Sequence, residues 1–365
     1  MSPYGQDMYV AIQEETTRGN EIHDDPSFIP VESQAIKPAF VEEEDNEFRG
    51  DGVSIREQKT IQRYGQSCAG PLAGKFYPEG GSNKAGIALI LKYLFGDTHT
   101  TQIGSSPTHV HGFKKARDPF DADCGTIGDK GISVHVNRPT VCDTLEDYPS
   151  VGMRVAGVTL TQEPAQPLRF SADLFGQKQE DRTTKLAGVA FSTVGFFKQE
   201  HCVIYDTVTP NGIAPDYTSF TKGAANDVYV RSLSIGIVNG NTDQVVVGSA
   251  VNYPTETDIG KFISTISITA QARDATTGFS ALDMFDDWRN DNNIELYFEW
   301  DNLEIIAGTD TYKLMIHCPK IHITDSNIDD VQAGMNMISM TGNCLYSDTD
   351  LYAIGVFLQN SANAV

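Results

Sequence analysis

The chain has 365 residues, which is comfortable for two domains that each bury their own core. Lysine and arginine total 27 against 49 aspartate and glutamate, so the formal net charge is -22 at pH 7. This balance, with no cluster of basic residues, argues against a nucleic-acid-binding protein, because adhesion to a polyanion needs grouped Lys and Arg. Solubility is the simplest role of the acids.

The first 17 residues carry acids and lack the basic and apolar regions of a secretory signal. The apolar runs are far shorter than the roughly 20 residues that span a bilayer. We therefore expect a soluble protein made in a cytoplasm, without membrane contact. In that setting six widely spaced cysteines are expected to be reduced and buried, with disulfides as the alternative. They are Cys68, Cys124, Cys142, Cys202, Cys318 and Cys344.

Residues 1–26 are polar and aperiodic, and they predict an extended arm that becomes ordered only against a neighbour. Short β-type runs follow at residues 28–31 and 36–41. The acidic run at residues 42–45 predicts a solvated face. Further extended segments are expected at residues 55–64 and 72–77.

Residues 83–95 show the clearest helical pattern. Apolar side chains recur at helical spacing at Ile87, Ile90, Leu91, Leu94 and Phe95. Gly80, Gly81 and Ser82 supply a break and a possible N-cap, and Gly96 lies at the C-terminal stop position. The apolar stripe predicts packing against a sheet, at about 1.5 to 3 kcal/mol for each fully buried large side chain.

Residues 97–130 are rich in Gly, Pro, Asp and Thr, and predict a long loop that binds something or reaches another subunit. Alternating patterns then predict strands at residues 132–136, 153–161 and 168–175. The last of these closes a first unit.

The second half of the chain follows a similar plan. Strands with period 2 are expected at residues 228–235 and 261–268, separated by turn residues at 239–243 and by Tyr253-Pro254. A second helix at residues 279–290 carries Leu282, Phe285 and Trp288 on its apolar face. Further strands are expected at residues 294–300, 312–317, 335–341 and 351–358.

Two β-runs, one helix and three or four β-runs thus occur twice, with a possible seam near residues 185–215. We predict a mainly β fold of two tandem units, residues 27–190 and 191–365, each a β-sandwich or half-barrel with one helix. Because such units leave sheet edges unpaired, the repeat indicates a protein that assembles into a ring.

No catalytic, cofactor-binding or metal-ligating residues are predicted. The segment at residues 70–76 has three residues between its glycines instead of four, and Phe76 where a phosphate loop needs a hydroxyl. The segment starting at Asp121 has Ile132 where a calcium loop needs a bidentate Glu. Two tryptophans, Trp288 and Trp300, favour core packing over carbohydrate binding.

His109 and His111 share a face of an extended segment and could form a metal pair, with His99 and Cys124 in the same predicted loop. Without a third ligand at a diagnostic spacing, hydrogen-bonded loop histidines are favoured. The pairs His201-Cys202 and His317-Cys318 point to opposite faces if they lie in strands, so neither is a nucleophile with its base.

Two sets of segments carry a resemblance to a known family. The first set is residues 13–19, 28–33, 36–37 and 48–50, and the second set is residues 84–96, 151–160, 170–176 and 351–360. In order and in spacing the first set resembles the opening of tail tube proteins of tailed bacteriophages. The second set falls where that family has counterparts, so the resemblance spans most of the chain.

The resemblance implies rings whose inner strands join into a closed β-barrel, stacked into a tube that conducts the viral genome. Two units per chain suggest a homotrimeric pseudo-hexameric ring, with a homohexamer as the alternative. The implied partners are other copies of the chain, a tape measure protein in the lumen, tail terminator and baseplate or tip proteins, and passing double-stranded DNA. The protein would be a virion tail component and not an enzyme.

The arm at residues 1–26 and the loop at residues 97–130 are the expected contacts between rings, and the acids are expected to line the lumen negatively so that DNA slides. Two other functions remain open. One is another β-sandwich virion component, either a capsid or a tail-completion protein, and the other is a carbohydrate-active β-sandwich protein.

Overall fold

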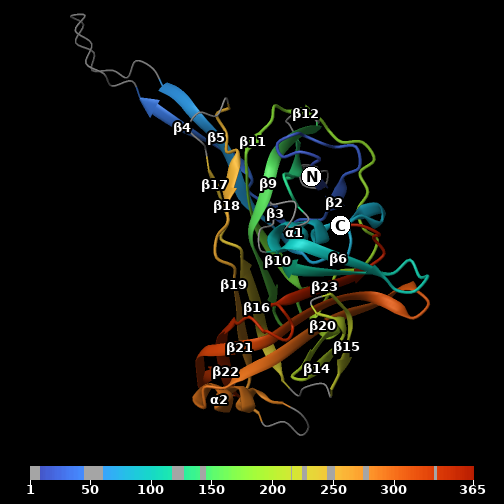
Figure 1. Cartoon of the computed structure of the whole chain (residues 1–365), viewed down its shortest axis with the longest axis vertical. Coiled ribbons are helices and arrows are strands. Elements are labelled where there is room, and N and C mark those ends of the chain that lie inside the picture. Colours follow the sequence, from blue (N-terminus) through green and yellow to red (C-terminus); the bar gives the residue numbers. More distant parts are fainter. Residues whose placement is uncertain are drawn as a thin grey trace, which may run out of the picture.

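The computed structural model describes residues 9–44, 61–116, 127–139, 145–214, 216–223, 228–244, 251–273, 279–332 and 335–365. This part of the chain is mainly β, as predicted, with two α-helices and two short 3-10 helices (Figure 1). The helices are α1 Ile87–Phe95, α2 Ala281–Arg289, η1 Gly81–Asn83 and η2 Gln199–His201.

The strands are β1 Val10–Glu14, β2 Ser27–Ile29, β3 Ser33–Gln34, β4 Lys37–Glu44, β5 Ile61–Lys75, β6 Gly96–Gln102, β7 His109–Lys115, β8 Ile132–Pro139, β9 Leu145–Gln162, β10 Arg169–Gly176, β11 Lys178–Gln179, β12 Thr183–Thr184, β13 Cys202–Tyr205, β14 Val208–Ile213, β15 Asp216–Lys222, β16 Val230–Val238, β17 Thr242–Gln244, β18 Glu256–Asp258, β19 Ile263–Gln271, β20 Asn293–Ala307, β21 Asp310–Gln332, β22 Met335–Cys344 and β23 Gly355–Asn360.

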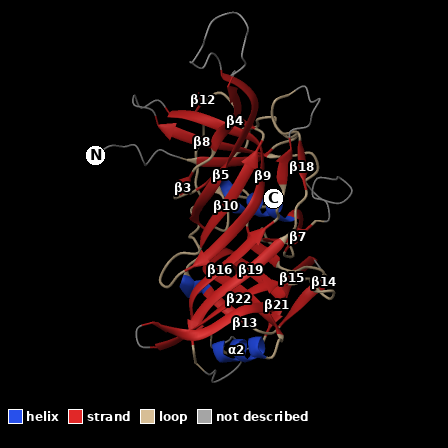
Figure 2. Cartoon of the chain, turned by 90° about the vertical axis from the view of Figure 1, so that its left-hand side faces the viewer, coloured by secondary structure: helices blue, strands red, loops and turns tan. Residues whose placement is uncertain are grey.

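Eight antiparallel strands form a central sheet in the order β4, β5, β10, β9, β16, β19, β22 and β21. Figure 2 shows β5, β10 and β9 above β16, β19 and β22. The strand β9 therefore joins strands from the first half of the chain to β16 from the second half.

The long strands β9 and β21 extend beyond the central sheet into further layers. The first part of β9 pairs with β8, which continues to β1 and β2. The first part of β21 pairs with β20 on one side and with β23 on the other, and β23 continues to β7 and β6. The core lies between these layers and the central sheet.

One face of the central sheet is apolar and buried, because side chains alternate between the two faces of a strand. A single cluster of buried side chains contains residues from both halves of the chain. Its members from the central sheet include Leu72, Phe170, Val158, Leu160, Leu233, Ile235, Ile237, Ile266, Ile268, Ile338 and Met340.

The first helix is confirmed, although it begins at Ile87 and not at residue 83. All of its side chains are buried, and it packs against β9, β6 and β7. Gly96 ends the helix in the left-handed conformation at φ 90°, as expected of a C-terminal glycine. The suggested N-cap is wrong: the capping position is Gly86, and the Ser27 hydroxyl accepts its N–H at 3.0 Å.

The second helix is also confirmed, with Ser280 as its N-cap. The Ser280 hydroxyl accepts the backbone N–H of Asp283, and the Asp283 carboxylate accepts the backbone N–H of Ser280. Trp288 is half-buried against the main core, and Trp300 is fully buried, so both tryptophans pack as expected.

Residues 9–26 contradict the expectation of an arm that is ordered only by a neighbour. The strand β1 pairs with β2 and β8, and Val10 and Ile12 are buried in the main core. Arg18, just after β1, is buried as well. Val10, Ala11 and Ile12 form a short apolar run. Because residues 1–26 are polar as a whole, this run does not stand out in the sequence.

The long loop predicted for residues 97–130 is wrong in its first half. Residues 96–115 form the antiparallel pair β6 and β7, and β7 also pairs with β23. The Thr and His side chains of β6 give no hydrophobic alternation, and most of them are only half-buried. Residues 45–60, 117–126 and 140–144 lie outside the described residues, and with them lie Asp121, Cys124, Cys142 and residues 48–50.

Candidate assembly surface

The face of the central sheet opposite the core is rich in hydroxyl groups. Register places Thr161 beside Ser234, Ser234 beside Ser267, and Ser267 beside Thr341. The hydroxyl oxygens of Ser267 and Thr341 are 3.2 Å apart, so neighbouring strands are also linked through side chains. We call this set the hydroxyl face: Thr159, Thr161, Ser171, Ser232, Ser234, Thr265, Ser267, Thr269, Ser339 and Thr341.

The hydroxyl face carries little net charge although the whole chain has a formal charge of -22. At one end of the row of hydroxyls Arg169 lies beside Thr161, with Lys75 next to it. At the other end Asp325 lies beside Thr341. Asp173 adds one exposed carboxylate on β10. These four flanking side chains are two basic and two acidic, so together they add no net charge to the hydroxyl face.

Both lateral ends of the central sheet are edges. Within the described residues β4 pairs with one strand, β5. From Ile323 onward β21 pairs with one strand, β22, because its pairing with β20 ends at His322. Edges of this kind are templates for pairing with another chain. No sheet of the described chain closes on itself.

The contact between β9 and β16 is a complete antiparallel junction between the two halves. It runs from Gln162 opposite Leu233 to Gly157 opposite Val238. At this junction β9 carries β10 on its other side, and β16 carries β19 on its other side.

A buried ionic cluster fastens the small hairpin of β17 and β18 to the first half of the chain. The Arg18 guanidinium donates to both carboxylate oxygens of Asp243, at 2.7 and 2.6 Å. It also donates to the hydroxyl of Thr257, which in turn donates to Asp243 at 2.5 Å. Burial, together with the neighbouring Arg18 charge, lowers the pKa of Arg154 to about 9. Sequence reasoning missed this cluster because Arg18 is more than 200 residues from both Asp243 and Thr257.

The two histidines considered as a metal pair, His109 and His111, hydrogen-bond to protein groups. The rings of His109 and His111 are stacked with centroids 6.4 Å apart. His111 is buried, and its Nε2 donates to the Asn360 side-chain oxygen at 2.9 Å, while its Nδ1 lies 2.9 Å from the Thr100 hydroxyl. His99 lies against Thr101. In the part of the chain that the structure describes, no three His, Cys, Asp or Glu side chains are grouped to hold a metal.

The histidine and cysteine pairs occupy structural positions. His317 is buried between the Tyr352 hydroxyl at 2.7 Å and the Glu295 carboxylate at 3.0 Å. Burial raises the pKa of the Cys202 thiol to about 12, and that of Cys68 to about 12. Cys68, Cys318 and Cys344 are buried free thiols, and Cys202 is half-buried.

No helix among the described residues is long and apolar enough to cross a bilayer.

Comparison with known families gives a match that covers most of the chain. The family described as phage tail tube protein matches residues 5–310 of this chain. The match covers β1 to β20, including α1, α2 and the β9–β16 junction. A search of curated proteins found no match.

Proposed function

Because the chain belongs to the phage tail tube protein family, we propose that three copies of it close into a ring and that such rings stack into the tube of a phage tail. The observation that carries this proposal is the order of the strands in the central sheet. Two edges remain at its lateral ends, and a copy of the same chain offers the complementary edge at each.

The order of strands supports two tandem units in each chain. The first four strands of the central sheet in chain order are β4, β5, β9 and β10. In the sheet the last two exchange places, so the spatial order is β4, β5, β10 and β9. The next four, β16, β19, β21 and β22, lie in the same relative order. In both sets a helix lies between the second and third strands. We assign the units to residues 27–190 and 191–365, with β1 as an addition to the first.

In this arrangement the β9–β16 junction inside each chain serves as the template for the junction between chains. The edge of β21 beyond Ile323 would pair with β4 of the next copy. Three copies supply roughly 24 strands, and at about 4.8 Å between strands and a tilt near 40° they enclose a barrel about 50 Å across its backbone. That opening is wider than a B-form DNA duplex, and closure removes the exposed edges.

The hydroxyl face would line the channel, since the opposite face of the sheet is buried in the core. The charges on this face give no support to a strongly negative wall. We propose a nearly neutral wall of Ser and Thr, to which phosphates have no cluster of cations to bind. Such a wall suits transient passage of double-stranded DNA and a tape measure protein, with terminator and baseplate proteins at the tube ends. The role is structural and not catalytic.

Photo-crosslinking of assembled protein tests the ring. A photoreactive amino acid at Thr324, an exposed position on the β21 edge, should crosslink to residues 37–44 of a second copy. The control is the same group at Ser232 on β16, beside the internal junction, which should crosslink within one chain. Negative-stain electron microscopy should show stacked rings. Products from Thr324 that lie only within one chain, or particles that remain single chains, would contradict the proposal.

A further inference from the structure

Two of the buried thiols, Cys318 and Cys344, come from the neighbouring strands β21 and β22. Register places Ile321 directly opposite Cys344. On its other side β21 pairs with β20, where Ile294 faces Ile321 and Leu296 faces Cys318. Between these two pairs β21 has one residue more than β20, and this bulge turns Cys318 to the same buried face as Ile321. The two cysteines are therefore diagonal neighbours on one face of adjacent strands.

The two thiols contact each other in the core. The Cys318 thiol donates a hydrogen bond to the sulfur of Cys344, and this bond lowers the pKa of Cys344 below its ordinary value. Ser264 on β19 lies opposite Cys344, one step beyond the pair of Thr265 and Asn343. The buried Ser264 hydroxyl adds to the lowering of the Cys344 pKa, and it has no other partner among the described residues. A thiolate at Cys344 thus has two donors beside it.

Cys344 is also the thiol of this pair that is nearer to solvent. Its side chain is 8% exposed, whereas that of Cys318 is 0% exposed. The strand β22 ends at Cys344, and the next two residues, Leu345 and Tyr346, are exposed. A small oxidant therefore meets Cys344 first, and Cys318 is placed to react second.

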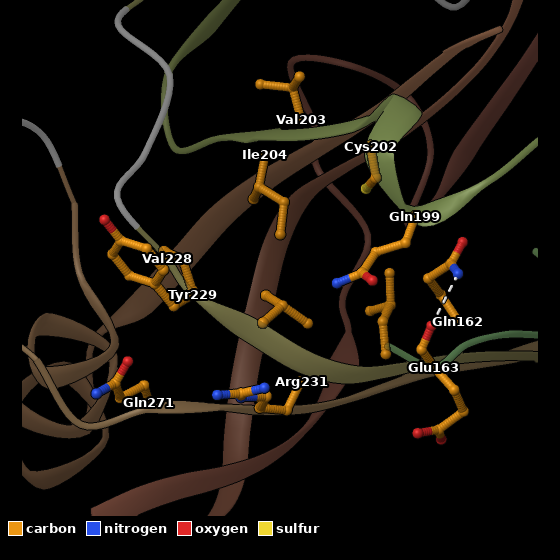
Figure 3. A pocket seen from close by; sticks show the side chains of 12 residues that line it. Gln162, Glu163, Gln199, Cys202, Val203, Ile204, Val228, Tyr229, Arg231 and Gln271 are labelled. Atoms are coloured by element: carbon orange, nitrogen blue, oxygen red, sulfur yellow. Dashed lines mark hydrogen bonds between the residues drawn. The ribbon is translucent and has the colours of Figure 1, made fainter. Parts of the chain in front are cut away.

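Cys202 provides a contrast, because it is more exposed but lacks these neighbours. It lines a groove of about 420 Å³ beside Gln199 and Ile204 (Figure 3). Among the described residues no other cysteine lines this groove. Loss of solvation raises the pKa of Cys202 to about 12. Exposure alone would make Cys202 the first thiol to react, whereas thiolate stability and a second sulfur in contact favour Cys344.

We propose that Cys318 and Cys344 form a redox modification site, which hydrogen peroxide converts to a disulfide in the folded chain. The Cys344 thiolate attacks one peroxide oxygen, the O–O bond breaks, and hydroxide leaves and takes up the thiol proton, so that Cys344 becomes a sulfenic acid. The Cys318 sulfur then attacks the Cys344 sulfur, and the Cys318 proton leaves with the sulfenic oxygen as water. Two thiols and one hydrogen peroxide give one disulfide and two waters, and two electrons pass from sulfur to oxygen.

The bond would fasten the place where β21 passes from one layer to the next. The strand β21 pairs with β23 as far as His317 and with β22 from Ile321 onward. Cys318 lies between these pairings, so the bond ties the crossing to the end of β22. A crosslink that closes a loop constrains the unfolded chain and so favours the folded one. The site lies within one chain and does not depend on the formation of rings.

Peptide mapping of full-length protein tests the site. Reduced, folded protein is treated with hydrogen peroxide, the remaining thiols are blocked with iodoacetamide, and the chain is digested without reductant. Mass spectrometry should find Cys318 linked to Cys344, lighter by two hydrogens than the separate peptides, while Cys202 is still alkylated. The urea midpoint of the oxidised protein should lie above that of the reduced protein, and dithiothreitol should reverse the shift.

Variants separate the roles of the residues. In Cys318→Ala, Cys344 should stop at the sulfenic acid, which dimedone traps. In Cys344→Ala, Cys318 should remain a thiol. Ser264→Ala should move the pH dependence of the oxidation rate to higher pH, because the thiolate loses a donor. The matched control is Cys202→Ala, which should form the same link at the wild-type rate.

Three results with the wild-type protein would overturn the proposal. The first is a link that forms in urea-unfolded protein but not in folded protein. The second is oxidation of Cys344 to the sulfinic acid without any link to Cys318. The third is faster reaction of Cys202 than of Cys344. A linked protein that unfolds at the same or a lower urea concentration would overturn the stabilising role of the bond.

Discussion

Several buried polar side chains of this protein are held by partners far away in the sequence. Arg18 meets Asp243, and His111 meets Asn360. Both contacts join the first half of the chain to the second. Arg18, which follows β1, binds the β17–β18 hairpin, and His111 links β7 to β23. A buried polar group without such partners is costly, so each of these contacts helps to specify one arrangement of the layers.

His111 should make stability depend on pH. Burial lowers the pKa of His111 to about 4 in the folded chain, from about 6.5. The folded state therefore binds fewer protons than the unfolded state between these values. The resulting stability is present above pH 6.5 and is lost as pH falls toward 4, by at most about 3 kcal/mol.

The measurement is urea unfolding of unassembled protein between pH 7 and 4.5. His111→Gln should lose free energy of unfolding less steeply than the wild type over this range, because it lacks the titrating group. His23→Gln, which replaces an exposed imidazole, should keep the wild-type slope. Identical slopes in all three proteins would exclude the assigned role of His111.

At the scale of elements, the two helices differ in how they are stabilised. The helix α1 is buried on all sides between β9 and the β6–β7 pair, and it lacks a side-chain N-cap. The helix α2 lies at the end of the molecule with only Ala281 and Met284 buried, and its Ser280 capping box supplies local stability. Tertiary packing therefore holds the first helix, and local hydrogen bonds contribute more to the second.

Truncation of one leucine in each helix should reveal this difference. Leu91→Ala removes a fully buried side chain of α1 and should lower the free energy of unfolding by about 2 to 5 kcal/mol. Leu282→Ala, at a half-buried position of α2, should cost clearly less. Urea denaturation of both variants gives the comparison, and equal losses would refute the assignment of α1 as the core helix.

Across the whole molecule, the proposed channel wall is nearly neutral while the chain is strongly acidic. A nearly neutral wall predicts that cations added to it would slow the passage of DNA. Replacing Ser234, Ser267 and Thr341 by Lys should leave tubes of normal length and slow genome ejection, because phosphates would bind the added charges.

The same three positions changed to Gln, which is long but neutral, should eject at the wild-type rate. Ejection is followed by the release of fluorescently stained DNA from virions that carry each variant. Unchanged kinetics in the Lys variant would mean that the hydroxyl face does not meet the DNA.

Both helices and most strands were predictable from sequence, since amphipathic and alternating patterns are local properties of the chain. The β6–β7 pair was missed because strands rich in Thr and His lack hydrophobic alternation, and β1 was missed because its short apolar run lies in a polar segment. The ionic cluster around Arg18 had no sequence signal at all, since no local pattern indicates which acid a distant arginine will meet.

The sequence by itself determined the β-rich composition of the fold, the two helices with their apolar stripes, and the excess of acids. Only the tertiary structure decided that Ser and Thr side chains of neighbouring strands gather on one face, that β9 and β16 join the two halves, and that β4 and β21 are left as edges. The physical reason is that periodicity depends on neighbours along the chain, whereas strand pairing and the place of each charge depend on contacts between residues that the sequence separates widely.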